Sequence, residues 1–278
     1  MHARVMTVLG FLLASLAAFP ASNVAGEVSG SLVIAGNGPE QVMIERLARA
    51  FEKANPRAYV DVLWDENSKP IDMLKSGQAH AAVTGKPEPD LLAIQIAWDG
   101  IAVMVNSSNH TKEVTKEQVA EIFSGKVRTW SDLGGPDTKV LLIDRPRNRN
   151  LRHVFEAYLG IAGKIPDTAK VIGPDDKAIK TVAGTLPPLS AVTYISLGQA
   201  LAAVRSGVAV RLLPLDKVEP EEPTVKDGRY QLRRPVLLLT ANTPNPTVEA
   251  FQRFALSKQG QEIVQNEAYT PMDLKNQP

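Results

Sequence analysis

The 278 residues of the chain include no cysteine. This absence excludes disulfide bonds and a lipid anchor attached to a cysteine, and it makes a structural zinc site improbable. Metal-ligand spacing is also missing among the four histidines, which are His2, His80, His110 and His153. We therefore expect neither a metal nor any other cofactor.

An excess of charge of one sign is absent as well. The 31 Lys and Arg residues nearly balance the 30 Asp and Glu residues, which leaves a net charge of +1. This balance gives no reason to expect a nucleic acid or an anionic membrane as a partner. Catalytic motifs are missing too: there is no G-x-S-x-G sequence, and the Gly-Lys pairs lack the other residues of a phosphate loop. We expect a binding protein rather than an enzyme.

Long apolar runs are confined to the start of the chain. There Arg4 precedes an apolar run from Val5 to Phe19, and small residues follow as far as Gly26. A basic start, a short apolar run and small residues predict a secretory signal peptide, which we assign to residues 1–25; an uncleaved anchor is the alternative. The mature protein is therefore expected in the periplasm.

The remaining part of about 250 residues fits two domains of common size. Short apolar segments alternate with segments of helical periodicity, which predicts an α/β fold with largely parallel sheets. Strands are expected at 31–36, 58–64, 79–85, 94–106, 138–146, 190–197, 209–215 and 233–240. The last segment, residues 246–268, has the pattern of one long amphipathic helix.

Arginines are concentrated in the stretch DRPRNRNLRHVFEAYLG, residues 144–160. They follow a predicted buried strand and precede a predicted helix. A strand end followed by a helix start is a place where backbone N–H groups and arginine forks can bind an oxyanion. Arg145 is the expected ligand contact, whereas Arg147 is more typical of a solvated loop charge.

Several motifs resemble, in order and at fitting distances, the phosphate-binding proteins of bacterial ABC transporters. The motifs are IAWDGIAVMVNSSN, EQVAEIFSGKVRTWSDLGG, SAVTYISLGQA, GRYQLRRPVLLLT and FQRFALSKQGQEIVQNEAYTPM. The resemblance implies a two-lobe type II periplasmic binding protein fold with two crossover strands. It places residues 31–104 and 235–278 in the first lobe and residues 105–234 in the second.

The same resemblance suggests which residues hold the ligand. Arg145 and Arg152 match two arginines of the family's anion loop, and Arg149 and Asn150 occupy positions where the family has small residues. Two other helix starts, near residues 39 and 69, would point N–H groups into the same cleft as the helix near residue 150. Asn67 or Ser68 is expected to cap the helix near residue 69, and Asn150 the helix near residue 150. The expected ligand-binding residues are Asn37, Gly38, Ser68, Arg145, Arg149, Asn150 and Arg152. Glu40 would repel an anion there unless it turns outward or pairs with an arginine.

His80 stands where the family has an aspartate that accepts the proton of phosphate. Selectivity for phosphate over sulfate is therefore expected to be poorer, unless another acceptor such as Glu40 or Asp65 takes this role. The resemblance implies a monomeric receptor that captures phosphate or a related oxyanion for an ABC permease in the inner membrane. Two alternatives stay open: a relative that binds another anionic solute, and an interaction or sensor protein without a ligand.

Overall fold

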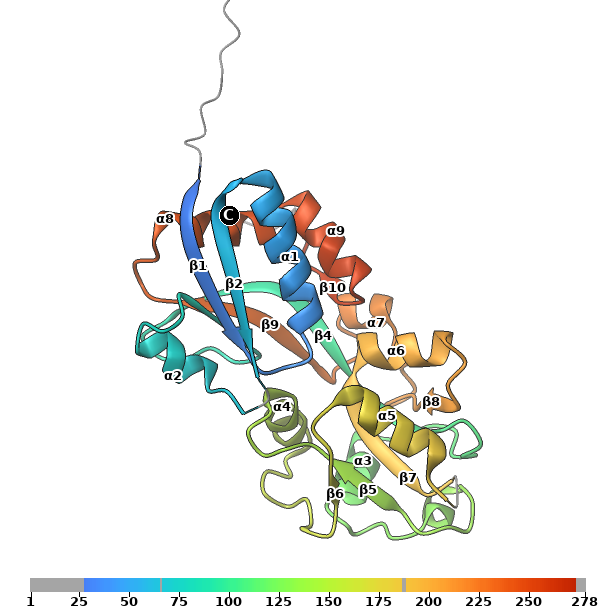
Figure 1. Ribbon diagram of the computed structural model, residues 1–278. Helices are drawn as coiled ribbons and strands as arrows, with labels where there is room; N and C mark the ends of the chain where they lie inside the picture. The colour runs from blue at the N-terminus through green and yellow to red at the C-terminus, as the bar shows by residue number, and fades with distance from the viewer. Residues whose placement is uncertain (1–27, 66, 187–188, 274–278) are drawn as a thin grey trace, which may run out of the picture.

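The computed structural model describes residues 28–65, 67–186 and 189–273, which form an α/β protein of two parts joined through long strands (Figure 1). The predicted signal peptide, residues 1–25, lies outside the described residues. One part contains the first and the last of the described residues, and the other contains those from the middle of the chain, as the colours of Figure 1 show. The chain therefore passes between the parts twice.

The strands form one path of hydrogen-bonded neighbours in the order β2-β1-β3-β9-β4-β7-β5-β6, and β10 and β8 also pair with β4. Their bounds are β1 Ser29–Gly36, β2 Arg57–Trp64, β3 Ala81–Thr84, β4 Leu92–Asn106, β5 Leu141–Asp144, β6 Lys170–Val171, β7 Ala191–Ser196, β8 Val210–Leu212, β9 Arg233–Thr240 and β10 Thr270–Pro271.

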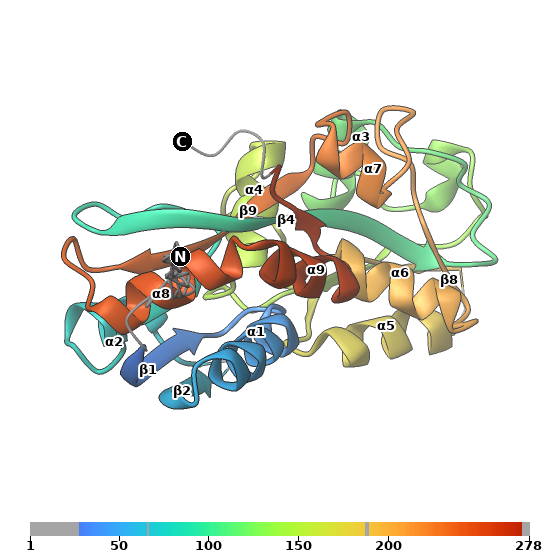
Figure 2. The ribbon, with the colours of Figure 1, turned by 90° about the horizontal axis from the view of Figure 1, so that it is seen from above.

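The helices lie on both faces of these strands (Figure 2). Their bounds are α1 Gln41–Ala54, α2 Pro70–Lys75, α3 Lys116–Phe123, the 3-10 turn η1 Trp130–Leu133, α4 Asn150–Leu159, α5 Asp175–Gly184, α6 Leu197–Arg205, α7 Glu222–Lys226, α8 Pro246–Ala255 and α9 Lys258–Asn266. Within the described residues no helix combines the length and the apolar character that crossing a bilayer requires.

The prediction of largely parallel sheets was wrong for the centre of the molecule. Strands β1 with β2 and β3, and β5 with β6 and β7, are parallel as expected. Every pairing that involves β4 or β9 is antiparallel. These two strands carry the chain from one part to the other and back, so they run in opposite directions side by side.

Strand β4 connects two separate hydrophobic cores. Ile96 and Ala97 belong to the core that contains α1, α8 and α9, whereas Ile101 to Val105 belong to the core that contains α3 to α6. The partner of β4 changes at the same point, from β9 up to Gly100 to β7 from Ile101 onward. An added Cβ at Gly100 would lie 2.8 Å from Cγ2 of Val225, so glycine permits the tight passage there.

Two helix boundaries differ from the sequence prediction. The long helix expected over residues 246–268 is two helices, α8 and α9, because Ser257 leaves helical geometry and its hydroxyl accepts a hydrogen bond from Gly260 N. Helix α2 begins at Pro70 with Lys69 as N-cap and without a side-chain cap. The predicted cap by Asn67 or Ser68 was wrong, because the Ser68 hydroxyl donates instead to the carbonyl of Gly36.

Candidate functional site

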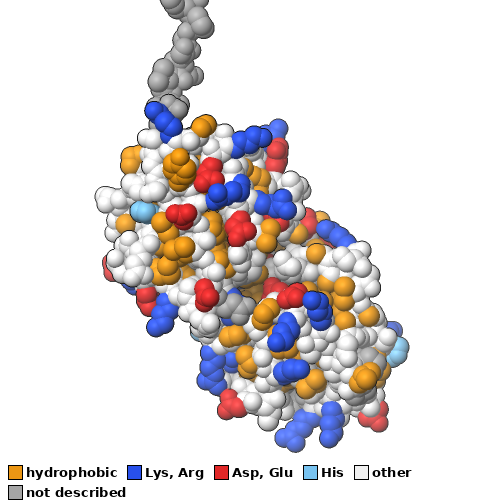
Figure 3. Space-filling model, viewed as in Figure 1, with side chains coloured by type: hydrophobic (Ala, Val, Ile, Leu, Met, Phe, Trp, Pro, Cys, Tyr) orange, Lys and Arg blue, Asp and Glu red, His pale blue; other side chains and the backbone are white. Residues whose placement is uncertain are grey.

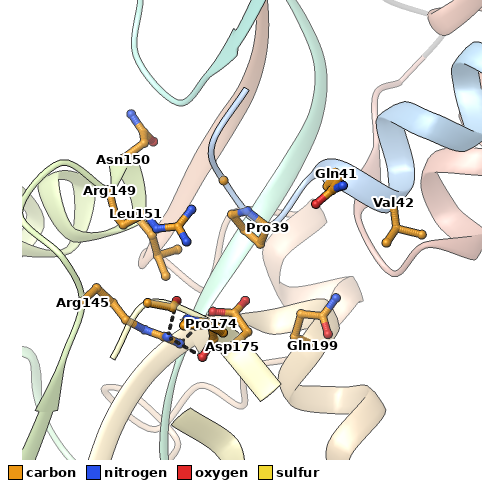
Figure 4. A pocket seen from close by; sticks show the side chains of 12 residues that line it. Pro39, Gln41, Val42, Arg145, Arg149, Asn150, Leu151, Pro174, Asp175 and Gln199 are labelled. Atoms are coloured by element: carbon orange, nitrogen blue, oxygen red, sulfur yellow. Dashed lines mark hydrogen bonds and ion pairs between the residues drawn. The ribbon is translucent and has the colours of Figure 1, made fainter. Parts of the chain in front are cut away.

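A cavity of about 210 Å³ lies where the first turns of three helices from both parts of the molecule come together (Figure 4). The helices are α1 from one part and α4 and α5 from the other. The lining residues are Gly38, Pro39, Gln41, Val42, Arg145, Arg149, Asn150, Leu151, Gly173, Pro174, Asp175 and Gln199. The first backbone N–H groups of a helix have no acceptor within the helix, so this arrangement directs positive partial charge toward the cavity.

Arg145 lies on the wall of this cavity, directly after β5, and its side chain is only 1% exposed. Its Nε donates to the carbonyl of Tyr194, and its Nη1 donates to the carbonyls of Ile172, Gly173 and Pro174. These bonds fix the guanidinium against the loop that leads into α5. The position of the arginine is therefore set by backbone carbonyls of two segments of the protein.

The remaining nitrogen of Arg145 faces a carboxylate. Its Nη2 lies 2.8 Å from Oδ1 of Asp175, the first residue of α5. The contact is an ion pair without hydrogen-bond geometry, and Nη2 and the second oxygen of Asp175, Oδ2, are both buried without a hydrogen-bond partner among the described residues. Asp175 could not be identified from the sequence pattern, because it lies 30 positions after Arg145.

Arg149 and Asn150 form the start of α4. Arg149 is the N-cap residue, and Figure 4 shows its guanidinium extending toward Pro39 at the start of α1. The prediction that Asn150 caps the helix was wrong: it is the first helical residue, and its side chain contacts the other part of the molecule. Its Oδ1 accepts a hydrogen bond from Nη1 of Arg234, and its Nδ2 donates to Oγ1 of Thr84.

Arg234 is the centre of a buried charged cluster next to the cavity. Its Nε and Nη2 lie 3.0 and 2.8 Å from Oδ2 of Asp99, and its Nη2 also pairs with Glu40. The side chain of Arg234 is 1% exposed, and Asp99 and Glu40 are buried as well. Glu40 therefore pairs with an arginine, which is one of the two conditions under which it does not repel an anion.

The three other residues expected at the ligand lie away from this cavity or deep beneath it. Nδ2 of Asn37 donates a hydrogen bond to the backbone carbonyl of Ser68, and both residues line a neighbouring recess that shares Asn150 with the main cavity. Arg152 lies behind Arg145, where it pairs with Asp144 and Glu156 and donates to the carbonyl of Arg145. Of the predicted set, the structure brings together Gly38, Arg145, Arg149 and Asn150.

Among the remaining candidates, Arg147 forms a solvent-exposed ion pair with Asp167, in agreement with the prediction of a solvated loop charge. His80 accepts a hydrogen bond at Nδ1 from the backbone of Val33 and does not line the cavity. Asp65 is exposed, and its Oδ1 accepts a hydrogen bond from Asn67 N. The helix start at α2 faces the neighbouring recess, so only two of the three predicted helix starts, those of α1 and α4, meet at the cavity, and α5 takes the third place.

The burial of the site changes the acidity of its carboxyl groups. Burial raises the pKa of Asp99 to about 6, although Arg234 and the hydroxyl of Ser196 act in the opposite direction. Burial also raises the pKa of Asp175, while Arg145, Arg149 and Arg234 favour its charged form. On the face of the molecule seen in Figure 3, Lys and Arg side chains are interspersed with Asp and Glu side chains, so this surface carries charges of both signs.

Comparison with known proteins agrees with this architecture. A family model described as the PBP superfamily domain matches residues 21–259. The chain is 26% identical over 259 residues to the phosphate-binding protein PstS of Bacillus subtilis strain 168, covering 90% of this chain and 83% of that protein.

Two solved structures share the fold. One is a phosphate-bound protein of Clostridium perfringens assigned to phosphate ABC transport, with a TM-score of 0.78, 23% identity and coverage of 88% of this chain and 100% of that one. The other is an ABC-type phosphate transport receptor from Vibrio cholerae, with a TM-score of 0.75, 24% identity and coverage of 87% and 100%. These structural matches confirm the predicted two-lobe type II periplasmic binding protein fold.

Proposed function

Because the chain belongs to the PBP superfamily, we propose that it is a solute-binding protein that captures inorganic phosphate, or a related oxyanion, for the permease of an ABC transporter. The observation that carries the proposal is the cavity between the starts of α1, α4 and α5, with Arg145 fixed in its wall by hydrogen bonds to four backbone carbonyls. Relatives named for phosphate binding, and a phosphate-bound structure of the same fold, support it. The function is binding and delivery rather than catalysis.

The proposed lobes are residues 31–104 with 235–278, and residues 105–234. The separate hydrophobic cores and the change of partner along β4 support this division. The cavity then lies between the lobes, and closure about the two long strands would bury the ligand. We further propose that residues 1–25 direct export to the periplasm and that the mature protein acts as a monomer.

Within the proposed site, Gly38, Arg149 and Asn150 contact the anion together with Arg145. Arg152 is a positioning residue, since it holds the backbone carbonyl of Arg145. Asn37 and Ser68 shape the neighbouring recess and fix the loop that precedes α2.

A second candidate ligand is a small organic anion. Pro39, Val42 and Leu151 give the cavity an apolar surface that inorganic phosphate does not need. An organic phosphonate or carboxylate would place its charge near Arg145 and its carbon atoms against these side chains. The permease partner would be the same class of transporter.

Calorimetric titration of the purified mature chain tests the proposal. The ligands are phosphate, arsenate, sulfate, molybdate and a short organic phosphonate, after bound anions have been removed by unfolding and refolding. We expect saturable one-to-one binding of at least one oxyanion, and compaction on its addition in small-angle scattering. Absence of heat and of compaction with all five at millimolar concentration would contradict the proposal.

A further inference from the structure

Two buried carboxylates between the proposed lobes share one guanidinium nitrogen. Nη2 of Arg234 lies 2.8 Å from Oδ2 of Asp99 and also pairs with Oε1 of Glu40. The side chains of Glu40 and Asp99 are 3% and 1% exposed, so water screens neither of them. One cation balances only one of the two negative charges. A buried charge without a counter-charge is costly, and binding of a proton commonly removes it.

The neutral groups around this acid pair, Glu40 and Asp99, do not supply a second positive charge. The hydroxyl of Ser196 on β7 donates to Oδ1 of Asp99. The hydroxyl of Tyr269, just before β10, is buried and has no hydrogen-bond partner among the described residues. Glu40 and Asp99 act on it electrostatically, and burial raises the pKa of Tyr269 well above its ordinary value, so the phenol stays protonated.

The acid pair lies next to the ligand cavity. Pro39 and Gln41, which flank Glu40 in the chain, both line the cavity. Asn150 also lines it, and its Oδ1 accepts a hydrogen bond from Nη1 of Arg234. An anion in the cavity therefore contacts residues that are joined to the acid pair along the chain or to its arginine by a hydrogen bond.

Charged side chains of the two signs balance around the cavity and the acid pair. Those that line the cavity or bind the shared guanidinium, with the guanidinium itself, are three arginines and three carboxylates: Arg145, Arg149 and Arg234, and Asp175, Glu40 and Asp99. The N–H groups at the helix starts attract an anion, but these six side chains have no net charge to balance it. A proton on one carboxylate supplies the missing positive charge.

We propose that the acid pair takes up one proton from solvent when the cleft captures an anion, and that release of the anion releases this proton. The inference rests on the proposed function and adds a regulation to it: the local pH sets how tightly the anion is held. By linkage, a ligand that favours the protonated protein binds more tightly as the proton concentration rises.

Of the two acids, Asp99 is the one expected to take the proton. Burial raises its pKa to about 6, against the effects of Arg234 and the hydroxyl of Ser196, and Glu40 acts in the same direction as burial. Asp99 is therefore largely charged at pH 7 in the free protein, and an anion nearby raises its pKa further. The affinity for the anion should fall as the pH rises through the pKa that Asp99 has in the complex.

The first test counts protons. Phosphate is titrated calorimetrically into the mature chain at pH 7 in buffers of different ionisation enthalpy, which gives the number of protons taken up per phosphate bound. Asp99→Asn keeps the shape of the side chain and an acceptor for Ser196 but removes the titrating group. Because the protonation change of phosphate itself is common to both proteins, their difference reports the acid pair. The wild type should take up about half a proton more than Asp99→Asn.

Two further variants accompany this comparison. Glu40→Gln neutralises the other member of the acid pair, should lower the proton uptake in the same way, and replaces Asp99→Asn if that variant does not fold. Asp176→Asn is the matched control, because Asp176 is exposed and pairs with Lys180. It should take up as many protons as the wild type.

Infrared difference spectroscopy gives a second measurement, on the wild type itself. Addition of phosphate should produce the carbonyl band of a protonated carboxyl group, and this band should be absent from the acid-pair variant. Equal proton uptake in the wild type and that variant, no such band in the wild type, or a band that persists in the variant would overturn the inference while phosphate binding leaves the proposed function intact. Failure to bind phosphate would overturn the inference, and failure with all five anions of the calorimetric series would overturn the proposed function as well.

Discussion

Asp99 and Arg234 are directly opposite each other on the antiparallel strands β4 and β9, and they form a buried ion pair with Oδ2 and Nη2 2.8 Å apart. The pair lies at the passage between the two cores, and Glu40 and Asn150 bind the same guanidinium from the two sides of the cavity. Arg234 therefore connects the crossover strands to the walls of the proposed ligand site.

Replacement of Arg234 should be costly for folding. Arg234→Ala leaves Asp99 and Glu40 buried without their cation, and the free energy of unfolding should fall by about 3–5 kcal/mol. Arg147→Ala is the control, since its ion pair with Asp167 is exposed and should contribute less than about 1 kcal/mol. Urea denaturation measures both. Similar small losses of unfolding free energy in the two variants would mean that the buried cluster contributes no more to stability than the exposed ion pair.

The acidity of Asp99 predicts an unusual pH dependence of stability. Because its pKa is raised from 3.8 to about 6 in the folded state, the folded protein binds the proton more tightly than the unfolded chain. The contribution of Asp99 is therefore fully present below about pH 4 and is lost as the pH rises through 6. The unfolding free energy of the wild type, minus that of Asp99→Asn, should decrease over this range. A difference in unfolding free energy that stays constant or increases over this range would contradict a raised pKa of Asp99 in the folded protein.

The alternation of strands and helices could be predicted from the sequence because it rests on local patterns. Buried runs such as residues 101–105 are apolar throughout, and helix α1 has its apolar residues at helical spacing. The antiparallel centre could not be predicted from such patterns, because β4 and β9 are far apart in the chain and their direction depends on the crossovers. The division into α8 and α9 was missed because the apolar pattern continues past Ser257.

The candidate site was predicted in part. Arg145 was identified from its place after a strand, but its four carbonyl partners and Asp175 come from segments that only the fold brings together. The Arg234 cluster was missed, although a signal was present: Asp99 and Arg234 are opposite charges in the two largely apolar strands expected to cross between the lobes. The register of β4 against β9 brings these two charges into contact.

The arginines of residues 145–149 should differ in their effect on the ligand. Arg145→Ala removes a fixed cation from the cavity wall and should weaken phosphate binding by about thirtyfold, or about 2 kcal/mol, with little change between two salt concentrations. Arg147→Ala should weaken the binding free energy of phosphate by only a few tenths of a kcal/mol, and mainly at low salt. Calorimetry at both salt concentrations gives the comparison. Equal, salt-screened losses in the two variants would mean that the arginines only attract the anion to the surface.

Contact between the lobes should depend on the absence of a side chain at residue 85. An added Cβ at Gly85 would lie 2.1 Å from Oδ1 of Asn150, the atom that accepts from Arg234. Gly85→Ala should therefore push α4 away from β9 and favour a more open form. Small-angle scattering without ligand should show a larger radius of gyration than in the wild type. Gly77→Ala controls for the loss of a glycine, because a Cβ at this turn would meet no atom within 4 Å. The φ of Gly77 is +76°, so this substitution adds local backbone strain but no contact between the lobes.

The most direct test of the proposed site is a crystal structure of the mature chain with arsenate, because arsenic gives an anomalous signal and arsenate has the shape and protons of phosphate. The account predicts one strong anomalous peak in the cavity between the starts of α1, α4 and α5, within hydrogen-bond distance of Arg145 or Arg149. A peak only at exposed arginines such as Arg147, or no peak in crystals grown with millimolar arsenate, would contradict it.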